Sequence, residues 1–344
     1  MYEARKLDKG AMDRASEKWN SVAKPLHSLG VFEDIVINIA GVQGTENISI
    51  EKRCVLVMCS DNGVVCEGVT QTGQEVTAIV TENFAKGDTS VCKMAHFANA
   101  EVFAVDVGVS RDVEGVINKK ISYGTKNMYR ESAMTYSEAQ KAIDTGIECV
   151  KELKEKGYKI IVTGEMGIGN TTTSAAVVSV LAGIEPEEVT GRGAGLSTDG
   201  LRRKIEVING AIELNKPDKN DAVDVLAKVG GYDIAALCGV FLGGSIYGVP
   251  IVIDGFISAA AALCAYKLCK DSRDFMIASH VSGENGAANI LKILDKKAPI
   301  NADMCLGEGT GGAMLLPLLD SVLCVYNEMS TFSDINVEQY KELK

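Results

Sequence analysis

The sequence predicts an α/β protein built on a doubly wound, mainly parallel β-sheet, and three observations support this fold class. Short runs of β-branched and other apolar residues alternate with longer segments of helical character along the 344 residues. Each of those runs is followed by a loop that combines glycine with a carboxylate or a hydroxyl. The 35 glycines and only 6 prolines indicate many tight turns between strands and helices.

The apolar runs are continuous rather than alternating, which is expected of strands that helices cover on both faces. The predicted strands are residues 54–58, 102–107, 159–163, 250–253 and 275–278. The helix candidates between them are residues 75–99, 137–156, 199–214 and 257–269. This order of elements makes a doubly wound sheet the expected architecture.

One uncharged segment, residues 234–253, has about the length that a bilayer requires. Gly243, Gly244, Gly248 and Pro250 interrupt it, and acidic residues rather than Lys or Arg flank it. We therefore expect a buried helix that turns into a buried strand, and no association with a membrane.

The overall charge and the cysteines limit the possible function classes. A formal net charge of −11 disfavours a nucleic-acid-binding protein, because phosphate contacts need a surplus of Lys and Arg. The N-terminus is charged and has no signal-peptide core, and the ten cysteines lie in apolar runs. We expect mostly buried thiols in a cytoplasmic protein. Three histidines and two C-x4-C pairs make a weak case for zinc, so no metal site is predicted.

The loops that follow the strands should lie together, because the carboxyl ends of parallel strands share one edge of a sheet and open α/β folds bind ligands there. The loops begin at Ser60, Asp106, Gly164, Asp254 and Ser279. Any one of them could be an ordinary turn. Five in succession favour a shared site for a small-molecule substrate.

The loop GEMGIGNTT (residues 164–172) is typical of an anion-binding helix start, since glycines expose backbone N–H groups and a helix N-terminus attracts phosphate. It lacks the lysine of a P-loop and the spacing of a dinucleotide motif. A plain helix start capped by Thr is the alternative.

A second loop, GRGAGLS (residues 191–197), leads into a helix with Arg202, Arg203 and Lys204. Backbone donors followed by a basic cluster suit a phosphate monoester, and Lys204 is the side chain we select. The alternative is that these three cations form a solvated helix face.

A third loop, LGEGTGG (residues 306–312), places Glu308 between glycines before an apolar helix over residues 313–323. Such a carboxylate suits a general base, and closure over an apolar ligand would raise its pKa. An exposed glutamate in a turn is the alternative. Glu165, Asp254 and Glu284 are further acids in strand-end loops, and His280 is expected to bond within its loop rather than to catalyse.

Residues 164–172 resemble the signature of the nicotinate-nucleotide–dimethylbenzimidazole phosphoribosyltransferase family. Other blocks agree in order, and the resemblance extends from about Lys24 to about Asp320. These blocks are KPLHSLG (24–30), VQG (42–44), GRGAGL (191–196) with Lys204, DGF (254–256), SH (279–280) and LGEGTG (306–311).

The resemblance implies a Rossmann-like sheet with a small helical domain formed by both chain ends. Residues 1–50 and the tail 326–344 would form the small domain, and residues 51–325 the catalytic domain. It also implies a homodimer whose sites are completed across the interface, and a reaction without a metal or an organic cofactor.

The implied reaction transfers ribose phosphate from nicotinate mononucleotide to a lower-ligand base of a cobamide, giving an α-ribotide and nicotinate. Glu308 would accept the proton of the incoming base. The implied substrate-binding residues are Gly167, Gly193, Lys204 and Ser282 at the phosphate, Glu165 and Asp254 at the ribose, and Thr72, Met166 and Leu306 at the base.

Three departures from the family pattern concern the pocket for the acceptor base. The chain has SDNG (60–63) for A-D-H-G, TGQ (72–74) for a segment that often contains Pro, and SGENG (282–286) in place of S-x-E-P-G-H. A different acceptor such as a phenol therefore stays open. A nicotinamide-dependent oxidoreductase and a non-catalytic subunit of a heteromeric transferase are the alternatives from other classes. The presence of Glu308 disfavours the last of these.

Overall fold

The computed structural model describes residues 2–341, and its centre is a six-stranded sheet with the order β3-β2-β1-β4-β5-β6. All neighbouring pairs in this sheet are parallel. The strands are β1 (Arg53–Ser60), β2 (Glu101–Gly108), β3 (Ile117–Asn118), β4 (Ile160–Met166), β5 (Ile251–Ile253) and β6 (Met276–Ala278). The fold class and the five predicted strands are confirmed, and β3 is a short edge strand that the sequence did not suggest.

Each face of the sheet contributes to a separate core, which explains the continuous apolar runs. On β1, Leu56 and Met58 face one core, whereas Val55 and Val57 face the other. The first core is completed by a layer of helices around the central α10, whose residues are buried as far as Ser245. These helices are α5 (Tyr136–Glu155), α6 (Asn170–Ala182), α7 (Pro186–Val189), α8 (Thr198–Asn215), α9 (Ala222–Val229), α10 (Tyr232–Tyr247), α11 (Phe256–Leu268) and α12 (Ala287–Ile293).

The second core is covered by α3 (Glu75–Ala85), α4 (Ser90–Phe97) and α13 (Thr310–Glu328). Two short 3-10 helices, η1 (Gly63–Glu67) and η2 (Lys270–Phe275), and a separate two-stranded sheet of β7 (His280–Val281) and β8 (Ile300–Asn301) complete the fold.

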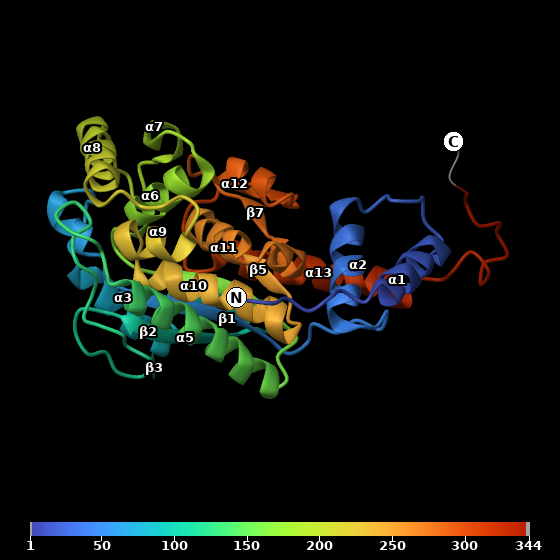
Figure 1. The fold of residues 1–344 in the computed structure, drawn as a ribbon. Helices are drawn as coiled ribbons and strands as arrows, with labels where there is room; N and C mark the ends of the chain where they lie inside the picture. The colour runs from blue at the N-terminus through green and yellow to red at the C-terminus, as the bar shows by residue number, and fades with distance from the viewer. Residues whose placement is uncertain (1, 342–344) are drawn as a thin grey trace.

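Helices α1 (Lys9–Ser21) and α2 (Val31–Gln43) lie beside the far end of α13 together with the segment that follows α13, apart from most of the sheet (Figure 1). The residues before α1 lie against the first core instead, where Gln140 of α5 donates to Tyr2 Oη and the Arg5 amide donates to the Ser245 carbonyl of α10. Trp19 packs on Tyr326 with ring centroids 4.8 Å apart, and Val22 forms an antiparallel bridge with Thr331. Residues 342–344 of the expected C-terminal tail lie outside the described residues.

The expected helix over residues 75–99 is wrong as one element, because α3 ends at Ala85 and α4 begins only at Ser90. Gly87 adopts φ +70°, and the Thr89 side chain caps α4 by accepting a hydrogen bond from the Cys92 amide. The apolar periodicity continues across this break, which is why the pattern alone suggested one helix.

The other helix predictions hold, with small shifts at their ends. Residues 234–253 form most of the buried helix α10 and then β5, as expected. Within residues 2–341, no helix is long and apolar enough to cross a membrane.

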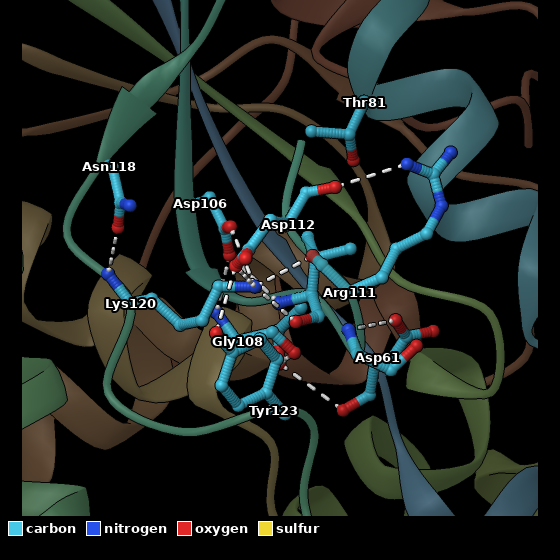
Figure 2. A network of polar contacts seen from close by, with 12 residues as sticks. Asp61, Thr81, Asp106, Gly108, Arg111, Asp112, Asn118, Lys120 and Tyr123 are labelled. Atoms are coloured by element: carbon cyan, nitrogen blue, oxygen red, sulfur yellow. Dashed lines mark hydrogen bonds and ion pairs between the residues drawn. The ribbon is translucent and has the colours of Figure 1, made fainter. Parts of the chain in front are cut away.

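A polar network fixes the segment that follows β2 (Figure 2). Lys120 forms a buried ion pair with Asp106, at 3.1 Å between Nζ and Oδ2, and donates to the carbonyls of Val109 and Arg111. Asp61, which follows β1, accepts from the Ser110 amide at 2.7 Å. The ends of β1 and β2 are thus tied together, and Arg111 joins this segment to α3 through an ion pair with Glu82.

Candidate functional site

A cleft of about 280 Å³ opens at the carboxyl edge of the sheet, where the strand-end loops meet. Nine of the ten predicted site residues line it, and Lys204 lies behind its wall. The nine are Thr72, Glu165, Met166, Gly167, Gly193, Asp254, Ser282, Leu306 and Glu308. Three of the five strand-end loops, those that begin at Gly164, Asp254 and Ser279, line this cleft, whereas the loops that begin at Ser60 and Asp106 do not, so the expectation that all five share one site holds only in part.

Glu308 stands in the left-handed region of backbone conformation, with φ +62°, between two glycines. Its side chain is half-buried, and its Oε2 accepts a hydrogen bond from the Val91 amide at 3.1 Å, in the first turn of α4. Burial raises the pKa of Glu308, while the amides of Val91 and Ser90 oppose that rise. A carboxylate in this state can accept a proton from a ligand in the cleft.

Glu165 supports Glu308 from the end of β4. The Glu308 amide donates to Glu165 Oε1 at 3.2 Å, and the Asn170 side-chain amide donates to Glu165 Oε2. Burial raises the pKa of Glu165. The Glu308 segment also comes so close to β4 that a Cβ on Gly164 would clash with the Glu308 carbonyl oxygen, so only glycine fits there.

Asp254 holds the start of α13, the helix that follows Glu308 directly. Its Oδ1 accepts from the amides of Gly311 and Gly312 at 2.7 and 3.1 Å, and its Oδ2 accepts from Gly309 at 3.1 Å. Burial raises the pKa of Asp254 to about 7, even though these three amides favour the ionised form. Both carboxylate oxygens are therefore already engaged in positioning the Glu308 loop.

Lys204 is buried at the other end of the cleft. Its Nζ donates to Thr171 Oγ1 at 2.8 Å and to the Gly191 carbonyl at 3.2 Å. Burial lowers its pKa to about 8, while the nearby charge of Glu284 acts in the opposite direction. A desolvated ammonium beside the first turn of α6 and the Gly193 turn is a suitable environment for a phosphate.

The alternative of a solvated helix face holds for the two arginines but not for Lys204. Arg202 is exposed and pairs with Asp199, whereas Arg203 pairs with Glu67. No signal in the sequence separates the three cations beyond their position on the helix.

Ser282 and His280 border the same end of the cleft. Ser282 Oγ accepts from the Glu284 amide at 3.3 Å, and His280 is buried with its Nδ1 3.0 Å from Ser279 Oγ. Burial lowers the pKa of His280, which keeps the ring neutral. This agrees with the expected role within the loop.

The three residues predicted for the base pocket line the cleft. Leu306 is exposed beside the Glu308 loop, Thr72 is exposed next to Gln71, whose side chain donates to the Gly195 carbonyl, and Met166 is buried. Sequence reasoning did not select other lining residues as site residues, because they are ordinary apolar or polar side chains. Among these are Gln71, Val80, Arg192 and Phe256.

The larger omission is the start of α4, which lies on the same face of the sheet as α13 and contacts Glu308 from there. The segment KGDTS (residues 86–90), a glycine followed by a capping threonine, was the signal that could have revealed it. The residues that the structure describes hold no cluster of three or more His, Cys, Asp or Glu side chains suited to a metal ion.

Comparison with known proteins identifies the family. Residues 4–337 match the family model described as "Phosphoribosyltransferase". The chain is 48% identical to the nicotinate-nucleotide–dimethylbenzimidazole phosphoribosyltransferase of Clostridium acetobutylicum over 98% of this chain and 97% of the relative. It is also 48% identical to the enzyme of that name from Ruminiclostridium cellulolyticum, over 99% and 97% of the two chains.

A solved structure shows the same fold. The crystal structure of CobT from Thermus thermophilus matches with a TM-score of 0.90 and 35% identity, covering 96% of this chain and 100% of that one. The chain therefore belongs to the nicotinate-nucleotide–dimethylbenzimidazole phosphoribosyltransferase family.

Proposed function

We propose that this chain, as a member of that family, transfers ribose phosphate from nicotinate mononucleotide to 5,6-dimethylbenzimidazole or a similar base. The products would be the α-ribotide (α-ribazole 5'-phosphate) and free nicotinate, for the nucleotide loop of a cobamide. The observation that carries the proposal is the pairing of a buried cation and a half-buried carboxylate at the two ends of one cleft.

In this proposal the phosphate of the donor lies between Lys204, Gly193, Gly167 and Ser282. The donor's C1' then faces Glu308. A ring nitrogen of the acceptor attacks C1', the bond from C1' to the nicotinate nitrogen breaks, and its electron pair leaves with nicotinate. Glu308 takes the N–H proton of the acceptor.

Glu165 and Asp254 would border the ribose, and their existing hydrogen bonds make them supports of the Glu308 loop. Thr72, Met166 and Leu306 would contact the base. The leaving group is a cationic pyridinium, so positioning and a base suffice, and no cofactor is needed.

We also infer a homodimer in the cytoplasm. Leu306, at the mouth of the cleft, is 57% exposed, as expected of a site that a second copy completes. The block at residues 24–30 resembles the family, yet none of its residues lines the cleft of its own chain. All ten cysteines are free, and Cys66, Cys305 and Cys324 are exposed, which suits a reducing compartment.

The test is a screen of acceptors, with a variant that lacks the Glu308 carboxylate as the control. Purified chain is incubated with nicotinate mononucleotide and a panel of benzimidazoles, purines and phenols, and nicotinate release and ribotide mass are measured. Glu308→Gln should keep the affinity for the nucleotide while turnover falls by about two to four orders of magnitude. Near-normal turnover of Glu308→Gln would remove this residue from the mechanism, and no nicotinate release with any acceptor would refute the function.

A further inference from the structure

The amino end of α4 is incomplete without a residue that is distant in sequence. A helix leaves its first four N–H groups without partners inside the helix. Thr89 satisfies one of them, the Cys92 amide, and no acidic residue lies in the first turn of α4. The Val91 amide is satisfied by Glu308 Oε2, from 217 residues further along the chain.

Glu308 thus has two supports on opposite sides. Its backbone is bound to Glu165 at the end of β4, and its carboxylate is bound at the start of α4. Its conformation at φ +62° is costly for a residue with a side chain, and it persists because both ends of the residue are held.

We propose that the first turn of α4 is a positioning element for catalysis, which holds the Glu308 carboxylate ionised and facing the cleft through the backbone amides of Ser90 and Val91. The inference rests on the proposed function, in which Glu308 is the base. It assigns a catalytic task to a helix that contributes no side chain to the cleft.

The other charged groups around Glu308 do not account for its ionisation. Glu165 and Asp254 are acids, and His280 is kept neutral by burial. On α4 and the preceding turn, Lys93 pairs with Asp88 at 3.1 Å, and both side chains are largely exposed. The α4 amides are therefore the groups that oppose the effect of burial on Glu308.

The first test removes the backbone N–H of Ser90 by a substitution to proline, which this position can accept with little strain. Ser90 is exposed and is the first residue of the helix, a position at which proline is favoured. Thr89 before it is already extended, with φ −122° and ψ 167°, as the residue before a proline must be. Ser90→Pro is compared with Ser90→Ala, which loses the same hydroxyl but keeps the N–H.

We expect the acid limb of the pH profile of kcat/KM to move upward by about 0.5 to 1 pH unit in Ser90→Pro relative to Ser90→Ala. The sign follows because the loss of a donor to the carboxylate makes its protonation easier. Titrations of the substrates are the same for both variants and cancel in the comparison. Tyr136→Pro is the control for a first-turn proline, since Tyr136 begins α5 far from the cleft, and it should keep the parent profile.

The second test replaces Val91 with the α-hydroxy acid of valine, so that an ester oxygen stands where the N–H was. The side chain is unchanged, and this variant decides the matter if Ser90→Pro does not fold. An upward shift of the acid limb supports the inference. A uniform loss of rate with an unmoved limb would show that α4 has only a structural role.

These outcomes are separable from failure of the proposed function. If Glu308→Gln is inactive and neither amide variant moves the acid limb, the inference is wrong and the base assignment stands. If Glu308→Gln is active, both the inference about α4 and the assignment of Glu308 as the base are wrong.

Discussion

Lys204 shows at the scale of a single residue how burial selects one cation from three neighbours. Arg202, Arg203 and Lys204 are consecutive, yet only Lys204 is buried, 1% exposed, beside Thr171. Desolvation lowers its pKa to about 8, so its charge is available for a phosphate at neutral pH and is lost as the pH rises through that value.

We predict that Lys204→Ala raises the KM for nicotinate mononucleotide roughly 10- to 100-fold with a smaller effect on kcat, because a charge-assisted bond to phosphate is lost. Steady-state kinetics measure this. In the parent, the same KM should increase as the pH rises above about 8. Arg202→Ala, on the same helix and exposed, is the control and should behave as the parent does. An effect of Lys204→Ala on the acceptor's KM alone would refute the phosphate assignment.

At the scale of elements, the first turns of α6 and α10 meet over two buried carboxyls. The Asn170 side-chain amide donates to Glu165 and, at 3.2 Å, to Asp233 Oδ2. Asp233 Oδ1 and Asn62 Oδ1 have no hydrogen-bond partner among residues 2–341, and both lie so close to Gly231 that a Cβ there would clash with each. A proton on Asp233, donated to Asn62, would satisfy both oxygens.

Burial and the charge of Glu165 raise the pKa of Asp233 to about 7, well above its value in the unfolded chain. A raised acid pKa gives stability that is fully present below about pH 4 and is lost as the pH rises toward 7. Asp233→Asn carries a permanent donor in place of the proton and lacks this dependence. We therefore predict that its free energy of unfolding, minus that of the parent, increases by up to about 1.4 kcal/mol per pH unit over that interval.

Urea denaturation at several pH values between 4.5 and 7.5 checks this prediction. Asp199→Asn, at an exposed site on α8, is the matched control and should track the parent. A difference between Asp233→Asn and the parent that does not change with pH would mean that Asp233 is ionised in the folded protein.

Some elements of the fold could be predicted from the sequence, and some contacts between elements could not. Strands such as β1 and β4 were predictable because burial on both faces requires an unbroken apolar run, and the glycine loops were predictable because they follow those strands. The contact of α4 with Glu308 was not, since it joins residues that are 217 positions apart in the sequence. The Asp233 pair was equally hidden, because a lone acid beside an uncharged segment gives no sign of what it will contact.

At the scale of the whole molecule, the division into domains stays a prediction. Figure 1 shows α1 and α2 beside the C-terminal segment at the end of α13, whereas the residues before α1 lie along the large domain. We propose that residues 1–50 and the tail from residue 326 form a small helical domain on the end of α13. The Trp19–Tyr326 contact and the Val22–Thr331 bridge join these two ends of the chain.

The exposed apolar side chains indicate where a second copy of the chain would dock. Met314 and Leu318 are 42% and 40% exposed one turn apart on α13, and Phe97 is 80% exposed on the neighbouring α4. These two helices pack on each other and flank Glu308, so an interface here would cover the mouth of the cleft.

We predict that the double change Met314→Glu and Leu318→Glu converts a dimer into a monomer, because four glutamates would be buried in a two-fold interface. Sedimentation velocity at micromolar concentration measures the change. If the partner completes the site, the KM for the acceptor should rise as well. Leu214→Glu, at a leucine on α8 that is 54% exposed, is the control and should stay dimeric. A parent chain that sediments as a monomer would contradict the dimer itself, and a dimer that survives the double change would place the interface on another face.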